Sequence, residues 1–311
     1  MKANKVSIVE MGLRDGLQNE KTVIDIQTRI EMALRLATAG AKRIELGSFV
    51  RADWVPQMAG SKEVISGVLA LQKQGKISKD VIFSALVPNE HGFKEALASE
   101  IHEIAIFAAC SESFSKKNIN CSIAESFERF KPVMTLAKKH KIKVRGYLSV
   151  CFGCPFEGAV SEARVVSLAY KMHKMGVYEI SIGDTIGVAH VGQVESLLKK
   201  LKAKIPIKKI AGHFHDTRGQ ALANIEKAFQ MGVKTFDSSL GGLGGCPYAP
   251  GATGNVATED VVYMFHGMKV KTGLNLQGLV DMNPWMSKKV LHELPSKVGK
   301  VGTLKPQGKV L

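Results

Sequence analysis

The sequence is poor in several features that would mark particular classes of protein. Five cysteines in 311 residues, an odd number in a chain of this length, argue against a scaffold held by disulfide bonds. No stretch of 18 apolar residues occurs, and the first residues pass into a strand-like run without a signal segment or an amphipathic leader. We therefore expect a cytoplasmic protein with no membrane partner.

Nucleotide-binding motifs are also missing. The sequence contains no GxxxxGK[ST] phosphate loop. The glycine-rich stretch from Gly242 reads GLGGCP, so Pro247 stands where a dinucleotide-binding fingerprint needs its third glycine. One CxxC pair, Cys151 and Cys154, has no second pair near it, and we interpret both as structural thiols.

Acidic residues are few relative to basic ones. The chain has 43 Lys and Arg against 28 Asp and Glu, a formal net charge of +15, which favours partners that carry phosphate or acid groups. The basic residues are scattered through amphipathic patterns, and only 6% of the residues are aromatic, which leaves little for stacking on bases. We expect no nucleic-acid partner, and a basic polyanion-binding protein remains the non-enzymatic alternative.

Short β-branched runs alternate with longer stretches whose apolar residues recur at helical spacing. Several helical stretches end in a glycine just before the next run, as at Gly40, Gly176 and Gly232. Eight such units over about 250 residues predict a (β/α)8 TIM barrel, and a doubly wound open sheet is the alternative. The eight runs cover residues 6–9, 42–46, 81–87, 103–107, 143–150, 178–182, 208–214 and 234–239.

The chain shows no linker rich in proline, serine or glycine. We predict one catalytic barrel over residues 1–267. Residues 268–311 then form a C-terminal helical extension and a tail packed on the barrel.

Polar residues fall at the ends of the predicted strands, and in a barrel these ends share one rim. His213 and His215, in the motif GHFHD, are two residues apart and project from one face of the seventh strand. Alone they are equally compatible with ordinary histidines near a strand end. With Asp15 after the first strand and Asn255 after the eighth, they make a mixed nitrogen and oxygen set suited to Mg²⁺ or Mn²⁺. Arg14 would add a fixed cation for a developing oxyanion.

Other strand ends carry candidate residues as well. The second strand contains Glu45 and is followed by Ser48, and Asp184 follows the sixth. The loop after the eighth strand holds six glycines between residues 241 and 254, with Cys246 near its centre. So many glycines predict a mobile or tightly turned loop.

Together these residues resemble the 3-hydroxy-3-methylglutaryl-CoA lyases, within a wider superfamily of metal-dependent barrel lyases and synthases. The similarity covers nearly the whole chain, and GLQNE after Arg14-Asp15 and GLGGCPYA before the last barrel helix are specific to the lyases. The resemblance implies a homodimer that cleaves 3-hydroxy-3-methylglutaryl-CoA into acetyl-CoA and acetoacetate, as in leucine degradation and ketone-body formation. A divalent ion, Mg²⁺ or Mn²⁺, would be the cofactor, and coenzyme A would enter as part of the substrate.

The resemblance also implies roles for individual residues. The metal ligands would be Asp15, His213, His215 and Asn255, with Glu45 beside the metal. Arg14 would stabilise the enolate, Cys246 would act from a lid, and His213 or Asp184 would be the base. Residues assigned to the substrate, the surroundings of the metal or the lid are Gln18, Ser48, Ser181, Asp184 and Glu259, and residues 116–120 would contact coenzyme A.

Three departures from the family pattern lie near this site. Leu46-Gly47 stands where Thr-Thr is common, Phe214 where Cys is common, and Arg218 where Tyr is common. They leave open a related 3-hydroxyacyl-CoA as substrate. A Claisen-type synthase that joins acetyl-CoA to a 2-oxo acid is the enzymatic alternative.

Overall fold

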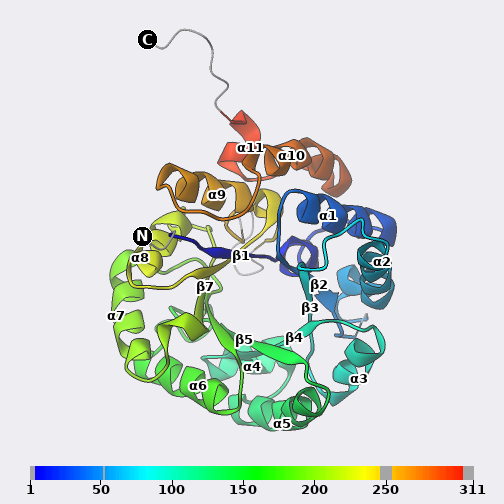
Figure 1. Ribbon diagram of the computed structural model, residues 1–311. Coiled ribbons are helices and arrows are strands. Elements are labelled where there is room, and N and C mark those ends of the chain that lie inside the picture. The colour runs from blue at the N-terminus through cyan, green and yellow to red at the C-terminus, as the bar shows by residue number, and fades with distance from the viewer. Residues whose placement is uncertain (1–3, 52, 246–253, 304–311) are drawn as a thin grey trace, which may run out of the picture.

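The computed structural model describes residues 4–51, 53–245 and 254–303, and its centre is a closed barrel of eight parallel strands (Figure 1). Neighbouring strands pair in sequence order, and the last strand pairs with the first. The eight predicted strands are all found, so the barrel is confirmed and the open sheet is excluded. The strands are β1 (Ser7–Glu10), β2 (Arg43–Ser48), β3 (Ile82–Leu86), β4 (Glu103–Ala109), β5 (Lys143–Ser149), β6 (Glu179–Asp184), β7 (Ile210–Phe214) and β8 (Thr235–Ser238).

Helices form a ring around the barrel (Figure 1), and their apolar faces pack with the outer faces of the strands into one continuous core. Gly40, Gly176 and Gly232 follow three of these helices with φ values of 97°, 97° and 103°. A side chain would be strained in that conformation, which explains the glycines at the predicted helix ends. The ring consists of α1 (Ile26–Thr38), α2 (Ser61–Lys73), α3 (Glu90–Ala98), α5 (Ile123–Lys139), α6 (Glu162–Lys174), α7 (Val191–Lys202), α8 (Ala221–Gln230) and α9 (Thr258–Gly267).

Two helical elements go beyond the sequence prediction, and both lie where the site forms. The turn after β1, which contains Arg14 and Asp15, is a π-helix, η1 (Gly12–Gly16). A further helix, α4 (Glu112–Ile119), precedes α5 and begins where the Ser111 side chain accepts a hydrogen bond from the Phe114 N–H. Short 3₁₀ turns complete the elements: η2 (Pro56–Met58), η3 (Ile207–Lys209) and η4 (Leu240–Gly242).

The barrel interior is filled by inward side chains, with a buried charged network among them. Arg145 Nε contacts Glu179 Oε1 at 2.8 Å, and both terminal nitrogens of Arg145 contact the Asp237 carboxylate, at 2.8 and 3.1 Å. Arg43 joins the network through Glu179, also at 2.8 Å. A small apolar cluster also occupies the interior: Val9, Met11, Leu86, Ala105 and Tyr147. Because the interior is occupied, chemistry is left to the rim.

The C-terminal extension consists of α10 (Leu276–Val290) and α11 (Lys297–Val301), which lie beside α9 and α1 (Figure 1). Asp260 in α9 accepts hydrogen bonds from Ser296 Oγ and from the Val298 N–H, both at 2.8 Å. The Ser296 N–H donates to the Gly241 carbonyl at 3.0 Å. The extension therefore supports η4 and α9, and the division of the chain at residue 267 stays a prediction.

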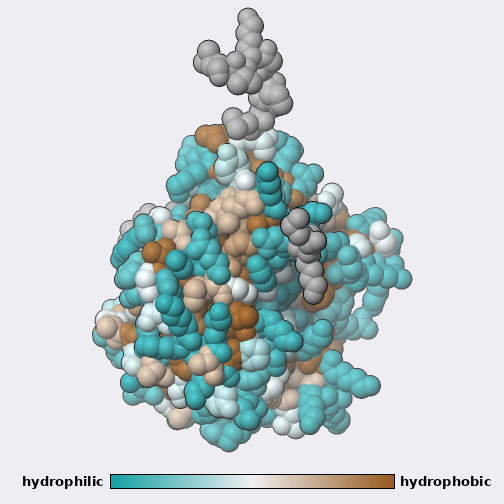
Figure 2. Space-filling model, turned by 60° about the vertical axis from the view of Figure 1, so that its left-hand side comes forward, coloured by the Kyte–Doolittle hydropathy of each residue, from teal (hydrophilic) through white to brown (hydrophobic). Residues whose placement is uncertain are grey.

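On the face shown in Figure 2, hydrophilic residues predominate and apolar ones lie in small patches among them. Within residues 4–51, 53–245 and 254–303, every helix is too short or too polar to cross a membrane.

Candidate active site

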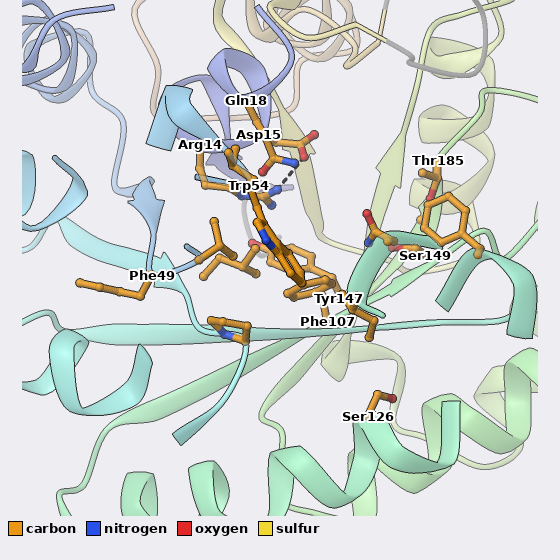
Figure 3. A pocket seen from close by; sticks show the side chains of 18 of the residues that line it. Arg14, Asp15, Gln18, Phe49, Trp54, Phe107, Ser126, Tyr147, Ser149 and Thr185 are labelled. Atoms are coloured by element: carbon orange, nitrogen blue, oxygen red, sulfur yellow. Dashed lines mark hydrogen bonds and ion pairs between the residues drawn. The ribbon is translucent and has the colours of Figure 1, made fainter. Parts of the chain in front are cut away.

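A cavity of about 680 Å³ opens at the rim formed by the carboxyl ends of the strands. Arg14, Asp15 and Gln18 lie together on one side of this cavity, and Tyr147 lies next to the Arg14 guanidinium (Figure 3). In a barrel of this kind the active site is expected at this rim, and the cavity lies there.

Asp15, His213 and His215 meet in this cavity. Asp15 Oδ2 lies 3.8 Å from His213 Nε2 and 3.9 Å from His215 Nε2. One ligand atom from each of the three residues lies within 4.8 Å of the others. Two imidazole nitrogens and a carboxylate oxygen that converge on one region are a suitable donor set for a divalent cation. The residues therefore fit the metal that the sequence implied.

The charges in this cluster are set by its surroundings. Burial raises the pKa of Asp15, but Arg14 and the two histidines outweigh it and hold the pKa at about 2. Burial, together with the charge of His213, lowers the pKa of His215 to about 4. Burial also opposes the charge of His213, yet a hydrogen bond to Asp237 and the charge of Asp15 raise its pKa above the ordinary value. At neutral pH, Asp15 is thus an anion and His215 a neutral donor.

Arg14 is held in place by two carboxylates. Its Nε donates to Glu45 Oε2 at 2.5 Å and its Nη1 donates to Asp15 Oδ1 at 2.6 Å. Glu45 is fully buried and also accepts from the Tyr147 hydroxyl at 3.0 Å. Among the described residues, Arg14 forms its hydrogen bonds through Nε and Nη1 and none through Nη2, which leaves this nitrogen for a ligand in the cavity.

Asn255 joins the cluster through the segment after β8. It forms an isolated bridge with His215, and its Nδ2 donates to Asp15 Oδ2 at 2.8 Å. Next to Asn255, a backbone hydrogen bond joins two parts of the segment after β8: the Gly254 N–H donates to the Gly244 carbonyl at 2.9 Å. Cys246 lies outside the described residues, while Gly245, directly before it, lines the cavity.

Of the other predicted residues, Gln18 and Ser181 line the cavity and three do not. Ser181 Oγ is engaged with Asp237 Oδ2 at 2.7 Å. Asp184 accepts the Val188 and Ala189 N–H groups on its two carboxylate oxygens, at 2.9 and 3.0 Å. Ser48 donates its backbone N–H to Ser61 Oγ, and its own hydroxyl is buried without a partner among the described residues.

Glu259 is buried beneath η4, away from the cavity. Both of its oxygens accept the Gly241 N–H at 3.0 Å, and Asn283 Nδ2 donates to it as well. Burial raises the pKa of Glu259 to about 7, although these hydrogen bonds oppose the rise. Its contacts support η4, the turn that directly follows β8.

We expect Glu259→Gln to change how stability depends on pH. Because the folded-state pKa of about 7 lies above the unfolded value of 4.5, the stabilising proton is present below pH 4.5 and is lost as the pH rises to 7. From pH 5 to pH 8, the unmodified protein should lose about 2–3 kcal/mol of unfolding free energy relative to the variant. Urea unfolding at both pH values measures this difference. A difference that stays constant with pH would show that Glu259 is ionised throughout.

Three residues of the site go beyond the sequence prediction. Tyr147 holds Glu45, and its ring lies under the Arg14 guanidinium at 5.4 Å. Asp237 contacts His213, and Arg145 holds Asp237. A signal was available for Arg145, an ionisable residue within a largely apolar strand run, whereas the run around Asp237 is itself polar.

The family model described as HMGL-like matches residues 5–285. The chain belongs to the HMGL-like family.

Individual members of the HMGL-like family are similar over most of their length. The 3-hydroxy-3-isohexenylglutaryl-CoA/hydroxy-methylglutaryl-CoA lyase of Pseudomonas aeruginosa is 50% identical over 277 residues, which cover 89% of this chain and 90% of that protein. The mitochondrial hydroxymethylglutaryl-CoA lyase of Rattus norvegicus is 48% identical, over 94% of this chain and 88% of that protein. A crystal structure of the hydroxymethylglutaryl-CoA lyase from Pseudomonas aeruginosa has a TM-score of 0.92 at 47% identity and covers 96% of this chain and 97% of that one. An HMG-CoA lyase from Acinetobacter baumannii, in complex with coenzyme A and 3-methylmalate, has a TM-score of 0.92 at 32% identity and covers 100% and 99%.

The three departures from the HMGL-like pattern have local structural roles. Phe214 is buried against Phe152, with ring centroids 6.0 Å apart. Arg218 donates to the carbonyls of Ile186 and Gly187, at 2.8 and 3.1 Å. Residues 46–47 lie at a register shift between β2 and β3. None of these contacts removes a residue from the Asp15 cluster.

The stretch predicted to contact coenzyme A lines the cavity in part. Asn118, Ile119 and Asn120, at the end of α4, are lining residues, and Lys116 and Lys117 are not. Arg129 lines the same region and donates to the carbonyls of residues 119 and 120, at 3.2 and 3.4 Å. α4, which the sequence prediction did not include, is therefore a wall of the cavity.

Proposed function

We propose that this chain is a hydroxymethylglutaryl-CoA lyase, which cleaves 3-hydroxy-3-methylglutaryl-CoA into acetyl-CoA and acetoacetate. One observation carries the proposal: the Arg14 guanidinium and the two histidine Nε2 atoms all lie close to the single carboxylate of Asp15, in one cavity. A cation site for a hydroxy acid and a donor for an enolate oxygen are thus side by side. The family and the names of the similar proteins described above support the same activity.

Asp15, His213 and His215 would hold the metal, with Asn255 beside them. The side-chain oxygen of Asn255 would be the fourth ligand, and Asp15 is already anchored by Asn255 and Arg14. A mixed nitrogen and oxygen set without thiolate suits Mg²⁺ or Mn²⁺. When bound, such an ion polarises a coordinated hydroxyl and lowers its pKa.

Arg14 and Cys246 would act on the thioester end of the substrate. The C3 hydroxyl proton passes to a water molecule in the open cavity, and that carbon becomes the ketone of acetoacetate. The C2–C3 bond breaks, and its electron pair forms the enolate of the thioester. Arg14 Nη2 would donate to the enolate oxygen, because Nε and Nη1 are committed to Glu45 and Asp15. Protonation at C2 gives acetyl-CoA, and we propose Cys246 as the acid, in line with the family resemblance.

The two candidate bases, Asp184 and His213, have different hydrogen-bond partners and neighbours. Both Asp184 oxygens accept backbone N–H groups, which favours a role in shaping the loop after β6. His213 Nε2 faces Asp15 Oδ2, so its lone pair would be used on the metal. These contacts disfavour both residues as the group that takes the hydroxyl proton.

The proposed activity has a direct test. With 3-hydroxy-3-methylglutaryl-CoA and Mg²⁺, the protein should release acetoacetate, measured by a coupled dehydrogenase assay. EDTA should abolish the release, and excess Mg²⁺ or Mn²⁺ should restore it.

Two other outcomes would overturn the proposal. Absence of acetoacetate at high enzyme concentration, together with thiol release from acetyl-CoA and a 2-oxo acid, would identify a Claisen-type synthase. Binding of a polyanion such as heparin that weakens steeply with salt and ignores EDTA, without any lyase activity, would identify a polyanion-binding barrel.

A homodimer and a cytoplasmic location stay predictions. Cys110, Cys121, Cys151 and Cys154 are free thiols, which is typical of a reducing compartment. Sedimentation velocity would test the oligomeric state.

A further inference from the structure

Asp237 lies on β8, directly behind His213 of the proposed metal site. It stands opposite His213 in the register of β7 and β8, and 1% of its surface is exposed. Its carboxylate is surrounded by partners: His213 Nδ1 at 3.3 Å, Ser181 Oγ at 2.7 Å, and the Arg145 nitrogens at 2.8 and 3.1 Å. Several buried groups are therefore directed at one small acceptor.

Arg145 contacts the Asp237 carboxylate and keeps it ionised. Arg145 is also 1% exposed, and it pairs with Asp237 through two nitrogens and with Glu179 through the third. A buried guanidinium that binds a carboxylate with two parallel hydrogen bonds requires the carboxylate to be ionised. An ionised carboxylate only accepts hydrogen bonds, so every neighbour within hydrogen-bond distance must donate.

This requirement decides the tautomer of His213. In a neutral imidazole one nitrogen carries the proton and the other has the lone pair, and the hydrogen bond at one nitrogen selects the state of the other. Because Nδ1 faces an acceptor, the proton belongs on Nδ1. Nε2 then directs its lone pair toward Asp15 and the cavity.

We infer that Asp237, held by Arg145, is a positioning residue that fixes His213 with its proton on Nδ1 and its Nε2 lone pair in the cavity. The metal-binding part of this inference rests on the proposed function. Its energetic consequence is that His213 need not exchange tautomers or reorient when a cation arrives. Outer partners of this kind support metal affinity by about 10–100-fold.

His215 offers a contrast within the same cluster. Its Nδ1 is buried and has no hydrogen-bond partner among the described residues. The two histidines therefore present their Nε2 atoms to the same carboxylate oxygen from different supports. His213 is set by a buried ion pair, whereas nothing comparable selects the tautomer of His215.

The first test uses the unmodified, metal-free protein labelled with ¹⁵N-histidine. Long-range ¹H–¹⁵N spectra, recorded at a pH at which the His213 ring is neutral, should show His213 as the Nδ1–H tautomer alone. In Asp237→Asn, His213 should lose this single tautomer. A His213 that carries its proton on Nε2 in the unmodified protein would overturn the inference. Because no metal is present, this result is independent of the proposed function.

The second test measures Mn²⁺ affinity from the EPR signal of the free ion, without substrate. Asp237→Asn should weaken Mn²⁺ binding by about 10–100-fold. Glu103→Gln is the matched control, since Glu103 belongs to the same buried network, near Arg43 and Tyr178, but does not contact His213. The control should bind Mn²⁺ as the unmodified protein does.

The outcomes separate the two proposals. A folded Asp237→Asn variant, checked by its thermal melting, that binds Mn²⁺ within about threefold of the unmodified protein would contradict the positioning role. If the unmodified protein binds no Mn²⁺, the proposed metal site fails, and the tautomer of His213 still decides the role of Asp237. Should Asp237→Asn not fold, the tautomer in the unmodified protein decides by itself.

Discussion

Arg14→Lys is expected to lower kcat by about two to three orders of magnitude while the protein stays folded. A lysine keeps the positive charge beside Glu45 and Asp15. It cannot donate to both carboxylates in the fixed geometry of the guanidinium and also reach the enolate oxygen. Because that donation matters mainly in the transition state, KM should change much less than kcat. Steady-state acetoacetate release measures both constants.

The matched control for Arg14→Lys is Arg43→Lys. Arg43 is a partly buried arginine on β2, paired with Glu179, and it does not line the cavity. Its variant reports what the loss of a paired guanidinium in the barrel does to packing alone. If Arg14→Lys kept its turnover within about tenfold of the unmodified enzyme while Mn²⁺ still bound, Arg14 would not be the enolate donor. Arg14→Gln is less informative, because it leaves buried Glu45 without its cation, at a cost of about 3–5 kcal/mol.

Asp15→Asn is expected to weaken Mn²⁺ binding by at least about 100-fold, since a lost ligand should cost no less than a lost outer partner. Asp15 supplies the one carboxylate oxygen that both histidine Nε2 atoms face. The amide has the same shape but no negative charge. Activity should fall with the metal affinity and recover in part at high Mn²⁺ concentration. EPR of free Mn²⁺ and metal titration of the activity measure the two effects.

Asp216→Asn is the matched control for Asp15→Asn. Asp216 follows His215 directly, yet its Oδ1 accepts the Ala221 N–H at 3.0 Å and its Oδ2 lies 3.6 Å from Lys297 Nζ. Its carboxylate is therefore directed at α8 and α11. Equal losses of Mn²⁺ affinity in both variants would mean that negative charge near the site, rather than a ligand at Asp15, explains the effect.

The sequence predicted the barrel because barrel strands and helices obey local rules. The strand runs, the helical spacing and the glycines at Gly40, Gly176 and Gly232 are each visible within a few residues, and the structure confirms them. The cluster of Asp15 and the two histidines also follows from a local rule, since strand ends share a rim. What the rule cannot supply is the distance between their atoms.

The rest of the site depends on contacts between residues far apart in the chain. Asp237 was part of a predicted strand, but its function depends on His213 beside it and on Arg145 across the barrel. Periodicity indicates which residues point inward and leaves open which of them meet. The same limit applies to Asp184 and Glu259, which the resemblance assigned to the substrate, the surroundings of the metal or the lid, and whose carboxylates accept backbone N–H groups. A carboxylate near the rim can face the cavity or accept backbone N–H groups. The packing of the neighbouring loop decides which of the two it does.

The tie between Gly244 and Gly254 has a consequence for how this enzyme can be altered. The carbonyl of one glycine accepts the N–H of the other, and a Cβ on Gly254 would lie only 2.7 Å from that carbonyl oxygen. Two residues without side chains thus hold the backbone at residues 244 and 254 together. A side chain at Gly254 would push these two backbone segments apart and shift Asn255, the next residue, relative to the Asp15 carboxylate to which it donates.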